Sequence, residues 1–175
     1  MTLFSKVIGW VSFKIRNFAF DIARSGQKYF VSKFPKIDKT AVIGFSVRLI
    51  GPYNSIEIGK HTYINDAIIS AGENSKVTIG SHCAIGYRVS IKAVSHDLTN
   101  PYPDENGKVQ IVEKNISIGN RCWIGDNVFI REGITIGNHV VIGSNSVVTK
   151  SVPDNIVVAG VPARSIRTSN SETEK

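Results

Sequence analysis

Cysteine is scarce in this sequence, which has only two cysteines, Cys83 and Cys122, among 175 residues. They lie far apart and match neither a disulfide framework nor a CxxC metal pattern, as is typical of proteins in a reducing compartment. With 42% hydrophobic residues, the chain can form one packed domain. We therefore expect both cysteines to be small buried residues of a globular protein.

Long apolar runs are also missing. No uninterrupted stretch approaches the roughly 20 apolar residues that span a bilayer. The first residues do not match a secretory signal either, because Gly9, Ser12 and Lys14 interrupt the apolar run and no small-residue cleavage site follows. These features favour a cytoplasmic protein.

Negative charge is nearly absent from residues 1–36, where Asp21 is the single acid. Seven bases stand there: Lys6, Lys14, Arg16, Arg24, Lys28, Lys33 and Lys36. Seven bases minus one acid give this segment +6 of the total net charge of +7. Because the rest of the chain is almost neutral, a broad nucleic-acid-binding surface is not expected, and we predict no nucleic-acid partner.

The basic segment also carries an apolar stripe with a spacing of three or four residues, formed by Leu3, Val7, Val11, Ile15, Phe18 and Ile22. This spacing predicts an amphipathic helix over residues 3–24. Phe4, Ile8, Phe13 and Phe20 lie off this main stripe, so one packed face would leave several large apolar groups in water. Two roles stay open: the helix caps the open end of the following domain, or it rests on the anionic inner face of a membrane.

The rest of the chain repeats with a period of six. Large aliphatic residues recur at Ile118, Ile124, Ile130, Ile136, Ile142 and Val148, and shorter runs join Ile43 to Leu49, Ile58 to Ile64, and Ile79 through Ile85 to Ile91. Four residues after many of them comes a small or β-branched residue: Thr62, Cys83, Val89, Ser95, Cys122, Val128, Val140, Ser146 and Val152. Neither a helix nor an antiparallel meander has this period. We expect a triangular prism of short strands joined by tight bends, with positions one and five of each hexapeptide facing inward.

The repeat also sorts the histidines. His61, His82 and His139 all stand at position four of a hexapeptide, a bend position that faces outward, which favours a structural role. His96 stands where the repeat breaks, at the start of a segment rich in turn formers that we expect to protrude as a loop over residues 96–115. Its imidazole could accept a proton near neutral pH, although its position equally fits an ordinary loop histidine.

The lines "ISIGNRCWIGDNVFIREGITIGNHVVIGSNSVVTK" and "AVSHDLTNPYP" resemble the hexapeptide-repeat acyltransferases, in particular their sugar O-acetyltransferase branch. The resemblance runs from about Ile37 to Arg167. It implies an all-β fold, a left-handed parallel β-helix over residues 37–167, following the N-terminal segment 1–36. It also implies a homotrimer with active sites between subunits, and acetyl-CoA as co-substrate with no metal. Residues 168–175 are expected to form a disordered tail.

The resemblance also suggests roles for particular residues. His96 matches the histidine that removes the proton of the acceptor hydroxyl, and the segment Gly125–Asp126 matches the one whose backbone amide meets the oxyanion. Trp123 would line the acyl or acceptor pocket, form a subunit contact, or do both. Asn65 and Asp66 fall near the acceptor, and Asp97 either orients His96 or forms a turn. The residues expected to line the CoA channel are Ser144, Thr149, Lys150, Gly160, Arg164 and Arg167.

We therefore predict an acetyl-CoA-dependent O-acetyltransferase acting on a sugar or glycan hydroxyl. An amino sugar or serine is the alternative acceptor, but such enzymes usually carry a nucleotide-binding domain or a larger helical domain, of which the sequence shows neither. Two other classes on this scaffold are a γ-type carbonic anhydrase, which needs three histidines around a metal, and a non-catalytic scaffold subunit. The former is disfavoured by the common bend position of His61, His82 and His139.

Overall fold

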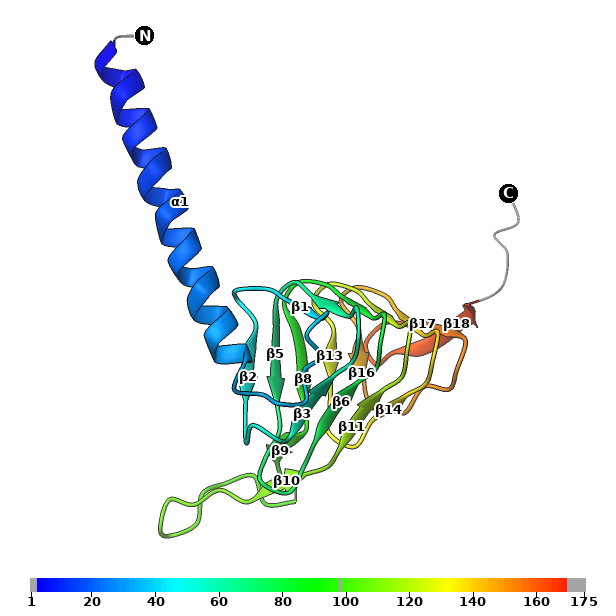
Figure 1. Cartoon of the computed structure of the whole chain (residues 1–175). Coiled ribbons are helices and arrows are strands. Elements are labelled where there is room, and N and C mark those ends of the chain that lie inside the picture. The colour runs from blue at the N-terminus through cyan, green and yellow to red at the C-terminus, as the bar shows by residue number, and fades with distance from the viewer. Residues whose placement is uncertain (1–2, 98, 170–175) are drawn as a thin grey trace. The chain divides into compact units, whose positions relative to one another are not determined.

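The computed structural model describes residues 3–97 and 99–169 of the chain. It divides the protein into two compact units, Met1–Lys33 and Phe34–Lys175. The first unit is one helix, and the second consists of short strands (Figure 1).

The first unit is helix α1, Leu3–Val31, which is longer than the predicted helix over residues 3–24. The apolar stripe was a poor guide to its end, because Ser25 and Gly26 follow the stripe without ending the helix. One glycine costs a helix only about 1 kcal/mol. The helix ends shortly before Pro35, and the residue preceding a proline disfavours the helical conformation. No helix in the described part of the chain combines the length and the apolarity needed to cross a bilayer.

The second unit contains three sheets of stacked, mainly parallel strands (Figure 1). The four-stranded sheet consists of β3 (Ile56–Ile58), β6 (Val77–Ile79), β11 (Ile116–Ile118) and β14 (Thr135–Ile136). The five-stranded sheet consists of β2 (Arg48–Ile50), β5 (Ala67–Ser70), β8 (Val89–Lys92), β13 (Phe129–Ile130) and β16 (Val147–Val148). The seven-stranded sheet consists of β1 (Val42–Ile43), β4 (Tyr63–Ile64), β7 (Ala84–Ile85), β12 (Trp123–Ile124), β15 (Val141–Ile142), β17 (Ile156–Ala159) and β18 (Arg164–Thr168). Consecutive strands pass from one sheet to the next, so the three sheets are the faces of the predicted prism.

The core of the prism is a set of aliphatic ladders. Ile64, Ile85, Ile124 and Ile142 are aligned in register across β4, β7, β12 and β15, and all four are buried. The prediction that positions one and five face inward is confirmed for nearly every hexapeptide. Ser95 and Ile43 are the exceptions, since both are half-buried. At Ser95 the chain leaves the prism as β9 (Val94–His96), and Ile43 lies on β1, the strand at one end of its sheet.

The edges of the prism need unusual backbone conformations. His61, His82 and His139 have φ between 54° and 59°, in the left-handed region, and all three are exposed. Their prediction as outward-facing bend residues is confirmed. Glycine serves close packing at another position, since a Cβ added to Gly119 would lie 2.7 Å from the backbone carbonyl group of Gly137 in the next coil.

Side chains also bridge successive coils along one edge. The side-chain oxygen of Asn138 accepts hydrogen bonds from the backbone and side-chain amides of Asn120, at 2.8 and 3.0 Å. The backbone and side-chain amides of Asn138 in turn donate to the Asp154 carboxylate, at 2.8 and 3.3 Å. The backbone N–H of Asn138, and secondly its side chain, lower the pKa of the Asp154 carboxyl.

The Asp154 carboxylate at this edge is expected to make the stability of the protein depend on pH. A lowered pKa means that Asp154 contributes stability above the pKa of the unfolded chain, about 4 for an aspartate, and that this contribution is lost as the pH falls through the lower folded value. Asp154→Asn should therefore reduce the loss of melting temperature between pH 6 and pH 3, measured by thermal unfolding. Glu105→Gln controls for the removal of one negative charge. An Asp154→Asn variant with the wild-type pH dependence would contradict the assignment.

Two antiparallel pairs interrupt the parallel stacking. β9 pairs with β10 (Ile111–Glu113), so the segment predicted as a loop over residues 96–115 contains a strand. β18 folds back antiparallel on β17. Of the tail predicted over residues 168–175, Thr168 ends β18 and the backbone N–H of Ser169 donates to the Asn155 carbonyl at 2.7 Å. The rest of that tail lies outside the described residues.

Candidate active site

His96 is the last residue of β9 and pairs with Ile111 of β10. The hairpin leaves the prism at the edge between the five-stranded and four-stranded sheets, because β8 precedes it and β11 follows it. The side chain of His96 is exposed. It therefore lies outside the packed interior, where a soluble substrate can reach it.

Asp97 forms a turn directly after His96. Its Oδ1 accepts hydrogen bonds from the backbone N–H and the hydroxyl of Thr99, at 2.8 and 2.7 Å. The backbone N–H of Thr99, and then its hydroxyl, lower the pKa of the Asp97 carboxyl. Of the two roles predicted for Asp97, these contacts favour the turn.

Trp123 lies on the outer face of the seven-stranded sheet and is 60% exposed. In register with it stand Ala84 on β7 and Val141 on β15. Val42 and Tyr63, which pair with each other on β1 and β4, continue this row and are also exposed. These residues form an exposed apolar strip on this face, and a contiguous exposed apolar surface is typical of an interaction site.

The predicted oxyanion amides already have partners within the chain. The Gly125 N–H donates to the Ile142 carbonyl at 2.8 Å, as part of the ladder between coils. The Asp126 N–H donates to the hydroxyl oxygen of Ser144 at 3.1 Å. A serine hydroxyl can rotate away but a ladder carbonyl cannot, so the Asp126 amide is the one that could serve an oxyanion.

Asp126 stands on an edge that also carries other predicted site residues. Its Oδ1 accepts a hydrogen bond from the backbone N–H of Tyr87 at 2.8 Å. One coil further towards the N-terminus, the backbone amides of Asn65 and Asp66 donate to the carbonyls of Ile85 and Gly86. The predicted acceptor residues Asn65 and Asp66 and the predicted acyl-site residues Gly125 and Asp126 therefore share the edge between the seven- and five-stranded sheets, with Ser144.

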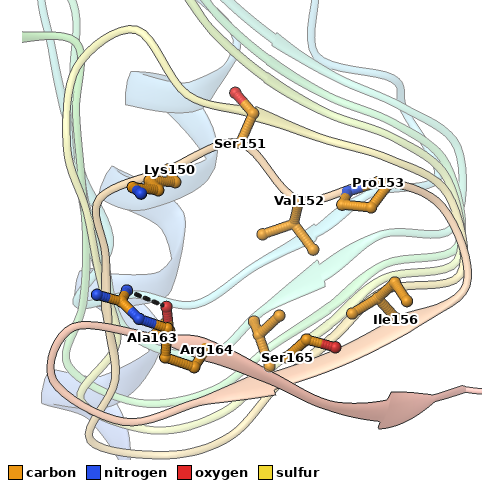
Figure 2. Close-up of a pocket in the computed structure, with 9 residues that line it drawn as sticks. Lys150, Ser151, Val152, Pro153, Ile156, Ala163, Arg164 and Ser165 are labelled. Carbon is orange, nitrogen blue, oxygen red and sulfur yellow. Dashed lines mark hydrogen bonds between the residues drawn. The ribbon is translucent and has the colours of Figure 1, made fainter.

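The residues predicted to bind CoA gather near the last coils. Lys150 and Arg164 line a cavity of about 230 Å³ together with Val152, Pro153, Ile156 and neighbouring residues. In Figure 2 the two basic side chains lie at one end of this cavity, and Pro153 and Ile156 lie at the other. The cavity is thus basic on one side and apolar on the other.

Three further residues predicted to bind CoA lie close in sequence to residues that line the cavity. Thr149 precedes Lys150 and is half-buried. Gly160, whose φ is 103°, accepts a hydrogen bond from the Val147 N–H at its carbonyl. Arg167 pairs with Val157 across β18 and β17 and is exposed.

One chain does not bring all of these residues together. His96 lies at the edge between the five- and four-stranded sheets, whereas Asp126 lies at the edge between the seven- and five-stranded sheets. The width of the five-stranded sheet separates the two edges. The predicted base His96 and the predicted acyl-site amide of Asp126 therefore lie at different edges of the prism in a single chain.

The comparisons with known proteins agree with the repeat. Residues 115–150 match the family model "Bacterial transferase hexapeptide (six repeats)". The galactoside O-acetyltransferase of Escherichia coli (strain K12) is 38% identical over 117 residues, which are 67% of this chain and 56% of the relative. A second protein of that strain, named for acetyl transfer in colanic acid biosynthesis, is 35% identical over 134 residues, which are 75% of this chain and 68% of the relative. The chain belongs to the hexapeptide-repeat acyltransferases.

A solved member of this family shares the fold. A hexapeptide-repeat-containing acetyltransferase from Vibrio cholerae O1 biovar eltor, in complex with acetyl-CoA, superposes with a TM-score of 0.63 at 28% identity, covering 82% of this chain and 78% of that one. Membership in the hexapeptide-repeat acyltransferases makes the prism a left-handed parallel β-helix, as predicted, and helix α1 precedes it in the sequence. The chain spans little more than half the length of the galactoside enzyme that it matches.

His61, His82 and His139 lie outside the hairpin, at the bends of the prism. The rings of His61 and His82 lie next to each other, tilted by 34°, with their centroids 5.1 Å apart. Among the residues that the structure describes, no group of three or more histidine, cysteine or acidic side chains is arranged to hold a metal ion. The three-histidine site of a γ-type carbonic anhydrase is therefore not formed by the described residues of one chain.

Two features of the site were missed at the sequence level. The apolar strip of Val42, Tyr63 and Trp123 was available as a signal, because each residue directly precedes an inward-facing isoleucine and so points outward. The hydrogen bond from the Asp126 N–H to the Ser144 hydroxyl could not be predicted from the sequence, because the two residues are 18 positions apart and meet only when the coils stack.

Proposed function

We propose that this protein transfers an acetyl group from acetyl-CoA to a hydroxyl group of a sugar or glycan. The observation that carries the proposal is the superposition on an acetyltransferase in complex with acetyl-CoA, over 82% of this chain. The relationship to a galactoside O-acetyltransferase supports a sugar as the acceptor. The exposed His96, outside the packed prism, supports a role in proton transfer.

In the proposed reaction, the neutral imidazole of His96 removes the proton of the acceptor hydroxyl. The hydroxyl oxygen attacks the thioester carbonyl carbon, and the Asp126 N–H, released from Ser144, stabilises the negative charge on the carbonyl oxygen. The carbon–sulfur bond then breaks, and the thiolate of CoA takes the proton from His96. The products are an O-acetyl ester and CoA, with no acetylated enzyme between them.

The acceptor class is tested by thiol release from acetyl-CoA against a panel of sugars, nucleotide sugars, amino sugars and serine. We expect release with hydroxyl acceptors of the sugar class. Release confined to the amino sugars would move the activity to N-acetylation, and release confined to serine would assign it to serine O-acetylation. No release with any acceptor would favour the non-catalytic scaffold.

We further propose that the active enzyme is a homotrimer with sites shared between chains. The separation of His96 from Asp126 on one prism supports this arrangement, because a neighbouring prism can supply the missing side of each site. The cavity beside Lys150, about 230 Å³, is also below the roughly 300–1,000 Å³ usual for ligand sites. The apolar strip around Trp123 offers a contact surface. Light scattering of the active protein should give three chains, and an active monomer would contradict the shared site.

The basic residues near the cavity are proposed to bind the phosphates of CoA. Neutral replacement of Lys150, Arg164 and Arg167 should raise the KM for acetyl-CoA at least about tenfold and change the KM for the acceptor much less. Steady-state kinetics in both substrates measure the two constants. The triple replacement of Lys39, Lys60 and Lys76, which are also exposed, removes the same charge elsewhere. An effect confined to the acceptor would mean that CoA binds at another surface.

For the N-terminal helix, capping of the prism and contact with the inner face of a membrane both stay predictions. Neither takes part in the proposed reaction. Sedimentation of the full-length protein with anionic liposomes tests the contact with a membrane.

A further inference from the structure

Helix α1 exposes a row of large apolar side chains. Val11, Ile15, Phe18, Ile22 and Tyr29 are all between 41% and 69% exposed. Residues at i, i+4, i+7 and i+11 lie on one face of a helix, and Tyr29 is 18 residues, five full turns, beyond Val11. These five residues, termed here the helix seam, therefore form one line along the helix.

The spacing of the helix seam is that of a heptad repeat. Ile15, Ile22 and Tyr29 are seven residues apart, and so are Val11 and Phe18. The sequence continues both series towards the N-terminus with Ile8 and Phe4, and the pattern is broken once, at Ser25. In a heptad lettered a to g, the series of Ile15 takes position a and the series of Val11 takes position d. Isoleucine thus occupies consecutive a positions, and phenylalanine or valine occupies the d positions before Ser25. A strict period of seven is required when helices wind around each other, whereas a flat surface imposes no such period.

The flanks of the helix seam allow a second helix to approach. The e positions of α1 are Ser12, Ala19 and Gly26, which are small, and a Cβ added to Gly26 would have no atom within 4 Å other than those of its chain neighbours and of its own helix backbone. The g positions include Lys14 and Lys28, whose long side chains can extend past a neighbouring helix into water. No bulky residue at e therefore shields the seam from a partner.

We propose that the helix seam is the core of a parallel, in-register coiled coil between copies of this chain. Identical copies placed side by side in the same direction bring each a residue against the same a residue of its neighbour. β-branched residues at a, with branched or large residues at d, suit two or three strands. The number three rests on the proposed trimer. The coiled coil would fasten the subunits at their N-terminal ends, beyond the surface that the prisms offer.

Cysteine cross-linking of the full-length protein tests this arrangement. Ile22→Cys places a thiol in the seam, where two copies meet, and Gln27→Cys places one at an f position on the opposite side of the helix. The native Cys83 and Cys122 are buried, so the wild-type protein serves as the background. Mild oxidation at micromolar concentration, followed by non-reducing electrophoresis, should give covalent dimers of Ile22→Cys at least about tenfold faster than of Gln27→Cys.

Light scattering of the same samples separates this inference from the proposed function. A trimer in which both variants cross-link at the same rate would overturn the coiled coil and keep the shared site, because the helices would then be close but unpaired. Failure of both cross-linking and trimer formation would overturn both proposals. If the full-length protein instead sediments with anionic liposomes, and Ile15→Ser with Ile22→Ser abolishes this binding without any preference in cross-linking, the seam binds lipid and the coiled coil is wrong.

Discussion

Turnover of the His96→Ala variant is expected to be about 10²–10⁴-fold below that of the wild type, at saturating acetyl-CoA and acceptor. The proposed reaction loses the group that accepts the hydroxyl proton, while the binding surfaces for both substrates are kept. The melting temperature should stay at the wild-type value, because the side chain is exposed at the end of β9 and outside the packed ladders. Steady-state kinetics and thermal unfolding of the purified variant measure both quantities.

His139→Asn is the matched control for this prediction. His139 is exposed and stands at an edge with φ of 56°, a conformation that asparagine tolerates well. Its replacement should leave turnover unchanged. Near wild-type turnover of His96→Ala would show that proton transfer does not depend on this residue, and equal losses in both variants would point to a general effect of histidine removal.

Gly119→Ala is expected to lower the free energy of unfolding by roughly 3 kcal/mol. The added Cβ would lie 2.7 Å from both the carbonyl carbon and the oxygen of Gly137. Both atoms belong to the backbone of the next coil, so no flexible side chain can move aside, and the stacking of two coils must open. Chemical denaturation followed by circular dichroism measures the change.

Gly26→Ala is the control for the same chemical change. Gly26 lies in α1, and its new Cβ would meet no atom outside its own helix within 4 Å, so the substitution should be neutral or stabilise the helix by up to about 1 kcal/mol. Comparable stability of Gly119→Ala and wild type would mean that the coils are not stacked as closely as described.

The prism was predictable because its cause is local and repeated. The inward-facing residues, such as Ile118 and Ile124, recur every six positions, and this spacing identifies them. The bend residues also stand at a fixed position of each hexapeptide. The extent of α1 was harder to predict, since the helix continues to Val31, well past Ile22, where the apolar stripe stops. The strand β10 was taken for loop because it pairs only with β9, outside the repeat.

The candidate site was less accessible from the sequence. A repeat indicates which side chains point outward, but it does not indicate which of them meet across coils. The contact between Asp126 and Ser144 and the cavity shared by Lys150 and Arg164 both join residues from different coils. The separation of His96 and Asp126 depends on which edge the hairpin leaves, and that follows from the order of the strands in three dimensions.

The central claim is that the acetyl group of acetyl-CoA is transferred directly to a sugar hydroxyl. The most direct measurement follows a ¹³C-labelled acetyl group from acetyl-CoA to the acceptor by NMR, with the wild-type protein and with His96→Ala. The account predicts a labelled O-acetyl ester on the sugar with the wild type, formed in step with free CoA and far more slowly with His96→Ala. The account would be contradicted if the label appeared only as free acetate or on an amine. It would also be contradicted if the folded protein transferred no label to any acceptor.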